Sequence, residues 1–420
     1  METILLKKAT IYDRESPHHQ EVMDILVKKG KISKIASDVR AQKVDKIIES
    51  KHLCVSPGWM DIGSWNGEPG FEHREDLVSL KNAGARGGYA YLAPFPNTNP
   101  FIDSRTQVEL LLGKNGHHPV QILPIGAVTK GGKGNEISEM LDMQDAGAVA
   151  FSDGFCKHLD RNVVLRAMQY LQACNGRLIF DLGSKNDTDG IVHEGEVSVQ
   201  MGLSGIPTLN EGMNCHTLIE LSNYTESYVH LHNISTGVFK RNQKLNRSGR
   251  VTYSVPYLNL IRSDKEMLGF DVMLKVLPPL RDTSTLRKLV KGLKTGMISA
   301  INTNHVPINE EDKQLEFSQA KFGAIGLETC FPALNTLVDD LDLETIVHIL
   351  SSGAYMVLGI KRHSIRKDES AVITIFDPNE NISITPQYFA SKSKNSPFLG
   401  AILKGKIKGV INQQKSLIFE

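Results

Sequence analysis

The feature that most constrains the fold is a set of eight short apolar runs that recur through the middle of the chain. Amphipathic segments with helical spacing separate most of them, such as residues 161–173 and 284–294. Runs that are apolar throughout are typical of parallel strands buried on both faces. Eight strand–helix units over roughly 300 residues favour a (β/α)8 barrel of the TIM type at residues 57–362. The runs lie at residues 58–62, 88–93, 120–126, 146–152, 177–182, 228–234, 250–256 and 298–303.

The two ends of the chain have a different sequence pattern from the middle. Short β-rich runs separated by turn residues occupy both ends, at residues 3–7, 23–28, 31–36, 371–376, 382–385 and 402–410. We therefore predict that residues 1–56 and 363–420 form one composite β-sandwich domain, so that the fold class is α/β with an added β domain. A doubly wound open sheet is the alternative, but no G-x-G-x-x-G follows the first strand, and the glycine-rich residues 131–134 lack P-loop spacing.

Charge and composition exclude several classes of protein. The chain has 48 Lys and Arg against 47 Asp and Glu, so neither a nucleic acid nor an anionic membrane is an expected partner. No apolar run reaches the roughly 18 residues of a membrane helix, and the first residues alternate like a strand rather than a signal peptide. These features predict a cytoplasmic protein. The five cysteines include no C-x-x-C pair, so neither a zinc knuckle nor a disulfide framework is expected.

The first barrel run continues into a motif that carries chemistry in a known family. Residues 57–70 read P-G-W-M-D-I-G-S-W-N-G-E-P-G, which resembles the motif P-G-x-I-D-x-H-x-H-x-R-E-P-G of the dihydroorotase and allantoinase branch of the amidohydrolase family. The resemblance implies the family's barrel and, in that family, a zinc-dependent hydrolase of cyclic amides. Further segments that resemble family motifs follow in order, at residues 94–100, 150–154, 230–236, 275–281, 303–308, 322–329 and 396–400.

The departures from the family begin in that first motif. The resemblance places the family's metal-binding histidine pair on Gly63 and Trp65, and its substrate-binding arginine on Gly67. A hydrolytic zinc needs three or more His, Cys or carboxylate ligands and one open position for water. Glycine offers no donor atom, and an indole cannot ligate the ion and would occupy its volume.

The later strands depart in the same way. The family's histidines on strands five and six align with Asp181 and Asn233, and its eighth-strand aspartate, both general base and metal ligand, aligns with Asn304. Amides are weak zinc ligands and cannot take a proton from water at pH 7. Only Asp153, in the fourth-strand motif, and Asp181 keep carboxylates, and such a pair suits Mg²⁺ better than zinc. We therefore expect no catalytic residue, no zinc and no other cofactor, with Asp153 as the residual metal candidate.

Two residues remain as candidates for binding a ligand. Asn97 aligns with the family asparagine that contacts substrate, although a P-N-T segment is equally a plain turn. His305 follows the degenerate base position and is the second candidate, as a polar group at the barrel mouth.

Other histidines offer no replacement metal site. If the residue at 233 points into the barrel, strand alternation directs His230 and His232 outward beneath the helices, where packed and hydrogen-bonded imidazoles are expected. Cys156 and His158 lie two residues apart in a loop, and we expect no catalysis there.

The resemblance also implies a role without chemistry. Inactive homologues in this family are known as partners that hold aspartate transcarbamoylase in an active assembly, and family members are often homodimers. Our first hypothesis is such a non-catalytic partner, a pseudoenzyme of pyrimidine biosynthesis. Two alternatives stay open. One is an active hydrolase of a cyclic amide, of the dihydroorotase or of the allantoinase and hydantoinase type, with a non-standard metal site. The other is a protein that binds a ureide or pyrimidine in the emptied mouth.

Overall fold

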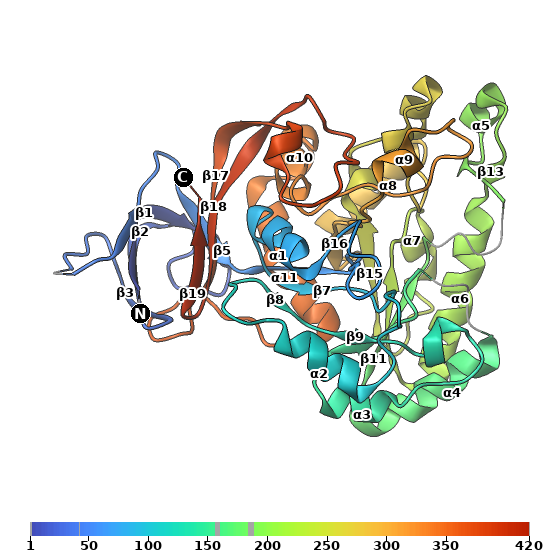
Figure 1. Ribbon diagram of the computed structural model, residues 1–420, viewed down its shortest axis with the longest axis horizontal. Helices are drawn as coiled ribbons and strands as arrows, with labels where there is room; N and C mark the ends of the chain where they lie inside the picture. The colour runs from blue at the N-terminus through green and yellow to red at the C-terminus, as the bar shows by residue number, and fades with distance from the viewer. Residues whose placement is uncertain (1, 42, 156–159, 184–188, 420) are drawn as a thin grey trace.

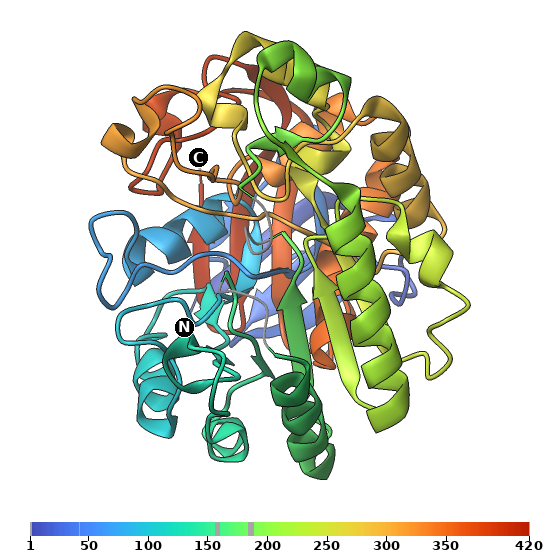
Figure 2. The same ribbon diagram turned by 90° about the vertical axis from the view of Figure 1, so that its right-hand side faces the viewer.

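The computed structural model describes residues 2–41, 43–155, 160–183 and 189–419. Figure 1 shows a sheet built from both ends of the chain at left and a barrel of strands and helices at right. Figure 2, turned to face the barrel, shows its strands with the helices arranged around them. The predicted α/β fold, a TIM-type barrel with a β unit made from the two termini, is confirmed.

The barrel strands coincide with the eight apolar runs. All neighbours pair in parallel, in the order β6-β7-β8 and, from the other side, β16-β15-β14-β11-β10-β9. The third run is split between β8 and β9, on either side of Leu123 and Pro124. The strands are β6 (Trp59–Ile62), β7 (Tyr89–Ala93), β8 (Gln121–Ile122), β9 (Ile125–Gly126), β10 (Ala150–Phe151), β11 (Arg177–Asp181), β14 (Tyr228–His232), β15 (Val251–Pro256) and β16 (Ala300–Asn302).

A buried aspartate joins the first barrel strand to the last. Asp61 on β6 accepts hydrogen bonds from the backbone amide and the hydroxyl of Thr303, at 2.8 and 2.9 Å. Burial raises the pKa of its carboxyl to about 7. A second link is the hydrogen bond from the Trp65 amide to the His305 carbonyl, at 2.8 Å. These bonds hold the ends of β6 and β16 together on the side where the mouth forms.

Helices surround the barrel, and the last of them, α11, covers the end at which the strands begin. Tyr355 on α11 donates to the Gly58 carbonyl at the start of β6, and Gly359 after α11 lies against Arg177 at the start of β11. The mouth is therefore at the opposite end, where the strands end. The helices are α1 (Leu77–Arg86), α2 (Arg105–Gly113), α3 (Met140–Asp145), α4 (Arg161–Leu171), α5 (Glu196–Met201), α6 (Thr208–Thr225), α7 (Val238–Asn242), α8 (Thr283–Lys294), α9 (Glu310–Lys313), α10 (Cys330–Leu337) and α11 (Leu343–Leu358).

The second unit is a sheet in which the C-terminal strands β17–β19 lie on one side and the N-terminal strands β1–β5 on the other, joined where β17 pairs with β5. Its order is β19-β18-β17-β5-β1-β2-β3, with β4 paired to β1. Apolar residues of both ends, among them Ile4, Ile25, Ile373 and Ile411, share one buried core. A short pair, β12 (Val192–His193) with β13 (Gly205–Ile206), lies outside both units. The sheet strands are β1 (Thr3–Ile11), β2 (Val22–Lys28), β3 (Lys31–Ala36), β4 (Lys46–Ile48), β5 (Cys54–Pro57), β17 (Val372–Ser383), β18 (Ile402–Asn412) and β19 (Lys415–Ile418).

One sequence expectation about this sheet is wrong. The runs at residues 371–376 and 382–385 were expected to be two strands separated by turn residues, which include Asp377 and Pro378, but β17 continues from the first run into the second. The register against β18 shifts between Asp377 and Asn381, so the extra residues bulge out of the ladder. A bulge accommodates proline without ending the strand, because the bulged residue need not donate to the partner strand.

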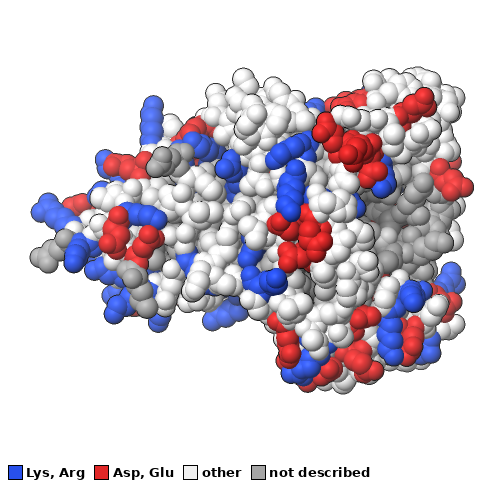
Figure 3. Space-filling view, viewed as in Figure 1, with Lys and Arg blue, Asp and Glu red and all other residues white. Residues whose placement is uncertain are grey.

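The molecular surface agrees with the near-zero net charge. On the face shown in Figure 3, acidic and basic side chains both occur over the sheet and over the barrel. None of the helices in the described ranges combines the length and the apolar character that a membrane span requires.

Candidate functional site

Three side chains that the resemblance marks as degenerate meet at the mouth. Asn233, just after β14, donates from Nδ2 to Asp181 Oδ1 at 2.8 Å and lies 3.4 Å from Asn304 Oδ1. Asn304, just after β16, donates in turn to the Leu277 carbonyl at 2.7 Å. Both asparagines have a positive φ, at 59° and 44°, which asparagine tolerates better than most residues. The three side chains are buried and form one hydrogen-bonded chain across the mouth.

The Asp181 carboxyl, which belongs to this hydrogen-bonded set of side chains, has a pKa far from its ordinary value. Burial raises the pKa of Asp181 to about 7, although hydrogen bonds from Asn233 and from the Gly183 amide favour the charged form. The structure therefore holds a carboxyl that takes up a proton near neutral pH.

Replacing this carboxyl should remove one pH-dependent component of stability. The pKa of Asp181 is about 7 in the folded protein and roughly 3.9 in an unfolded chain. Between these values the folded state binds a proton that the unfolded state lacks, so the stability contributed by Asp181 falls as pH rises, by about 1.4 kcal/mol per pH unit. We expect the unfolding free energy of Asp181→Asn, relative to wild type, to rise from pH 5 to pH 7 in urea titrations. If the difference in unfolding free energy between Asp181→Asn and wild type does not change with pH, the raised pKa of Asp181 is contradicted.

The end of the first strand is closed by packing. Trp65 is 6% exposed, and the Arg74 guanidinium carbon lies 4.1 Å from the centroid of its ring. Phe71 packs against the same ring, at 5.7 Å between centroids. A Cβ at Gly67 would collide with the Glu75 carbonyl and lie 2.6 Å from the Phe71 carbonyl. The position of the family's arginine therefore has no room even for a methyl group.

The orientation predicted for two histidines is wrong. His230 and His232 point into the barrel, and it is Leu231 that packs under the helices, in the cluster that includes Cys215 and Ile219 of α6. His230 bonds Thr252 and Ser254, each at 2.9 Å, and Ser254 also lies 2.9 Å from His232 Nδ1. Burial lowers the pKa of both imidazoles, to about 3 for His230, so both rings are neutral.

The error comes from extending strand alternation past the end of the strand. Regular pairing of β14 with β11 ends at His232, which lies opposite Asp181, and both face the interior. Asn233 then adopts a left-handed conformation, so it too points inward although it is the next residue. An asparagine at a strand end, before I-S-T, was the signal that alternation could stop there.

Asp153 and Asn97 are engaged with the backbone of neighbouring loops. The Asp153 carboxylate accepts from the amides of Val128 and Thr129, at 2.8 and 2.9 Å, and from the Thr129 hydroxyl at 2.5 Å. Asn97 donates to the Asp153 carbonyl at 3.1 Å and accepts from the Phe155 amide at 3.2 Å. Metal binding by Asp153 and ligand binding by Asn97 stay predictions, and either would compete with these hydrogen bonds.

His305, the other ligand candidate, is fully buried. Its Nδ1 accepts from the Gly326 amide at 3.1 Å, and its Nε2 lies 3.4 Å from a carboxylate oxygen of the equally buried Glu75. The ring thus connects the loop after β16 to two other loops. Both of its nitrogens face protein groups, so contact with a ligand stays a prediction that this geometry does not favour.

The donor set at the mouth does not fit zinc. Of the family's ligand positions that the structure brings together there, Asp181 has a carboxylate, while Asn233 and Asn304 have amides that bond to each other and to the backbone. No group of three His, Cys, Asp or Glu side chains positioned to hold a metal occurs among the residues described. Cys156 and His158 lie outside the described residues.

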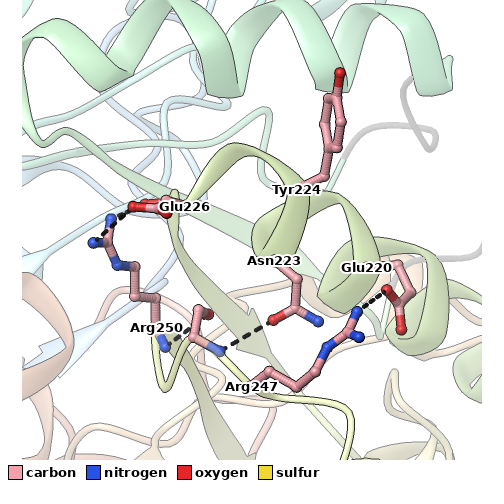
Figure 4. A pocket seen from close by; sticks show the side chains of 7 residues that line it. Glu220, Asn223, Tyr224, Glu226, Arg247 and Arg250 are labelled. Carbon is pink, nitrogen blue, oxygen red and sulfur yellow. Dashed lines mark hydrogen bonds and ion pairs between the residues drawn. The ribbon is translucent and has the colours of Figure 1, made fainter.

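A surface groove lies at the opposite end of the barrel, and the charged side chains that line it are paired with one another. Figure 4 shows it near the starts of β14 and β15. Arg247 pairs with Glu220 at 3.0 Å, and Arg250 pairs with Glu226 at 3.4 Å. Tyr224 points away from these pairs. Because each guanidinium has its own carboxylate, the groove offers no preference for an anion.

Comparisons with known proteins agree on family and fold. A family model described as "Dihydro-orotase-like" matches residues 53–238. The dihydroorotase of Pelotomaculum thermopropionicum is 35% identical over 409 residues, covering 96% of this chain and 95% of that protein. The dihydroorotase of Caldicellulosiruptor saccharolyticus is 33% identical over 425 residues, covering 99% and 98%.

Solved structures match over the same span. The L-hydantoinase (dihydropyrimidinase) from Arthrobacter aurescens superimposes with a TM-score of 0.85 at 19% identity, covering 100% of this chain and 96% of that chain. The dihydropyrimidinase from Brevibacillus agri has a TM-score of 0.80 at 15% identity, covering 99% and 95%. At these identities the match concerns the fold, a barrel of the amidohydrolase type.

Proposed function

Because the chain belongs to the dihydroorotase family, we propose that it is a member that keeps the fold without the metal-dependent hydrolysis, and that it acts as a non-catalytic partner of aspartate transcarbamoylase. In this proposal the protein serves pyrimidine biosynthesis by supporting another enzyme. A barrel can persist without its chemistry because packing and catalysis depend on different residues.

The observation that carries the proposal is the hydrogen-bonded chain of Asp181, Asn233 and Asn304. Hydrolysis of a ring amide needs an activated water and a group that accepts its proton. The amide of Asn304 stands at the base position, and it donates to the Leu277 carbonyl. An amide has no proton affinity at neutral pH, so the position of the family's general base cannot perform that step.

The closed end of the first strand supports the same proposal. An arginine grips a carboxylate substrate through its planar fork of N–H donors. Gly67 stands at the arginine position with no space for a side chain, and Trp65 under Arg74 fills the neighbouring space. The arrangement thus lacks the family's substrate grip as well as its metal ligands.

The first experiment measures metal content and turnover. We expect the purified protein to retain no stoichiometric zinc after exposure to zinc and dialysis, and to interconvert dihydroorotate and carbamoyl aspartate at least about 10³-fold more slowly than an active dihydroorotase, because both the activated water and the base are missing. The Pelotomaculum thermopropionicum relative, assayed in parallel, is the positive control. Stoichiometric zinc together with turnover would refute the proposal in favour of an active hydrolase with a non-standard site.

The second experiment tests the partner. We expect the chain to co-elute in gel filtration with aspartate transcarbamoylase from its own organism, and to raise the activity or the stability of that enzyme. The chain alone, run on the same column, tests whether it is a homodimer. If it elutes apart from the enzyme at micromolar concentrations, the partnership is refuted.

A second candidate function is the binding of a ureide or pyrimidine at the mouth. The observation in its favour is that Asn233 Oδ1 is buried and, in the described part of the chain, has no hydrogen-bond partner. A ring N–H of such a ligand would supply one, and a buried acceptor without a donor costs about 1–3 kcal/mol. A rise in melting temperature with orotate, dihydroorotate or hydantoin would support this candidate, and no rise with any of them would remove it.

A further inference from the structure

An imidazole from the sixth strand fills the space beside Gly63. A Cβ built on Gly63 would collide with His232 Nε2, and would lie 2.9 Å from Cε1 of the same ring and 3.0 Å from Cε2 of Phe95. Real Cβ atoms do not approach other heavy atoms so closely without movement of the neighbours. Any side chain at residue 63 and the present position of His232 therefore exclude each other.

The His232 ring is held firmly in that place. Its Nδ1 lies 2.9 Å from Ser254 Oγ, which also receives a hydrogen bond from Asn302 Nδ2 at 3.0 Å. Phe95 packs edge-on against the ring, with 5.2 Å between the centroids and 80° between the planes. The side chain is fully buried, and its Nε2 has no hydrogen-bond partner among the described residues. The edge of the His232 ring that faces Gly63 is therefore held by packing contacts, and not by a hydrogen bond from Nε2.

We propose that His232 is a steric substitute for the missing side chain at residue 63, and that the two residues form a coupled pair that occupies the position of the family's first metal ligand. This inference rests on the proposed function, since it treats the mouth as a site without metal. It adds that the space for a side chain at residue 63 is filled by another residue, and does not merely lack a ligand. Restoring a histidine at residue 63 alone therefore cannot rebuild the site, because His232 stands in its way.

A double-mutant cycle tests the coupling. Gly63 has a φ of +82°, so alanine there brings backbone strain as well as the collision. Gly202 has a φ of +65° and open space around its Cβ position, so Gly202→Ala measures the strain alone. We expect Gly63→Ala to lower the melting temperature more than Gly202→Ala in the wild-type background. In the His232→Ala background we expect the drop caused by Gly63→Ala to shrink toward that of Gly202→Ala, with only the contact to Phe95 remaining.

An equal drop for Gly63→Ala in both backgrounds would overturn the inference. If His232→Ala fails to fold, His232→Asn serves the same purpose, because its shorter side chain keeps a polar group near Ser254 and withdraws from Gly63. Neither measurement involves zinc, so a failed cycle leaves the proposed function standing, whereas zinc bound by the wild-type protein would refute the proposed function and not the coupling.

A second measurement asks whether the space is shaped for an imidazole. Removing the ring should leave a cavity beside Gly63, and engineered cavities bind small molecules that match the deleted group. We expect free imidazole to raise the melting temperature of His232→Ala, with no rise for wild type and a smaller rise for the double variant with Gly63→Ala. The same response in wild type and in His232→Ala would contradict the assignment of the space to His232.

Discussion

The Gly67→Ala variant is expected to lose about 3 kcal/mol of unfolding free energy, a large loss for the addition of one methyl group. The new Cβ would collide with the Glu75 carbonyl and approach the Phe71 carbonyl at 2.6 Å. Both obstacles are backbone atoms, which cannot rotate away as a side chain can. Relief would require the loop between β6 and α1 to move, and with it the ring of Trp65, which lies within 3.0 Å of the same point. Urea unfolding followed by circular dichroism measures the loss.

The matched control is Gly113→Ala. Gly113 is the last residue of α2, is exposed, and has no atom within 4 Å of its Cβ position. Alanine there should be neutral or stabilising by about 0.5–1 kcal/mol, because it lowers the entropy of the unfolded chain without strain. If Gly67→Ala is as well tolerated as this control, the loop at the mouth is not closed as described.

Asn304→Asp, which restores the family's base at its own position, is expected to destabilise the protein by about 3 kcal/mol at pH 8 without producing activity. The Nδ2 of Asn304 donates to the Leu277 carbonyl, and a carboxylate would place a second acceptor against that oxygen. Asp181 is connected to the same position through Asn233, so two buried carboxyls would share one site. Loss of the Nδ2 donor and addition of a buried negative charge both lower the free energy of unfolding.

The pH dependence of this loss distinguishes its cause. Burial and the neighbouring Asp181 should raise the pKa of the new carboxyl above its unfolded value, so the stability that it contributes is present at low pH and disappears as pH rises through the folded pKa. We expect the loss to shrink to about 1 kcal/mol at pH 5, where the protonated acid can donate to Leu277. The exposed Asn162→Asp in the first turn of α4 is the control, and should be neutral or stabilising by up to about 1 kcal/mol at both pH values, because a negative charge is favourable at a helix N-terminus. A loss that is independent of pH would contradict the buried network.

Much of the fold could be predicted because it depends on local pattern. The eight apolar runs correspond to the barrel strands, and the amphipathic segments at 161–173 and 284–294 correspond to α4 and α8. Such periodicity reports which residues face a core, and that is what decides strands and helices. The continuous course of β17 escaped prediction, because an Asp-Pro pair normally ends a strand and only the register with β18 shows that it bulges out instead.

The site could be predicted in composition but not in arrangement. Motif order placed Asp181, Asn233 and Asn304 at strand ends, and the structure brings these three side chains together. Their hydrogen bonds to one another could not be read from spacing, because the residues come from three different strands. The inward turn of His232 was missed for a related reason. It depends on the backbone angle of Asn233, which the tertiary contacts of the mouth select.

The sequence by itself determined the barrel, the β unit from both termini and which residues stand at the positions that the resemblance assigns to metal ligands, because hydrophobic period and side-chain chemistry are properties of the residues themselves. Only the tertiary structure decided what occupies the emptied positions. Gly63 leaves space, but whether that space holds water, a ligand or another side chain depends on groups that approach from distant strands. Here His232 approaches it from β14, and the carbonyls of Phe71 and Glu75 close the space at Gly67. Close packing between residues that are distant in the sequence determines which groups fill these spaces, and a sequence pattern does not record such contacts.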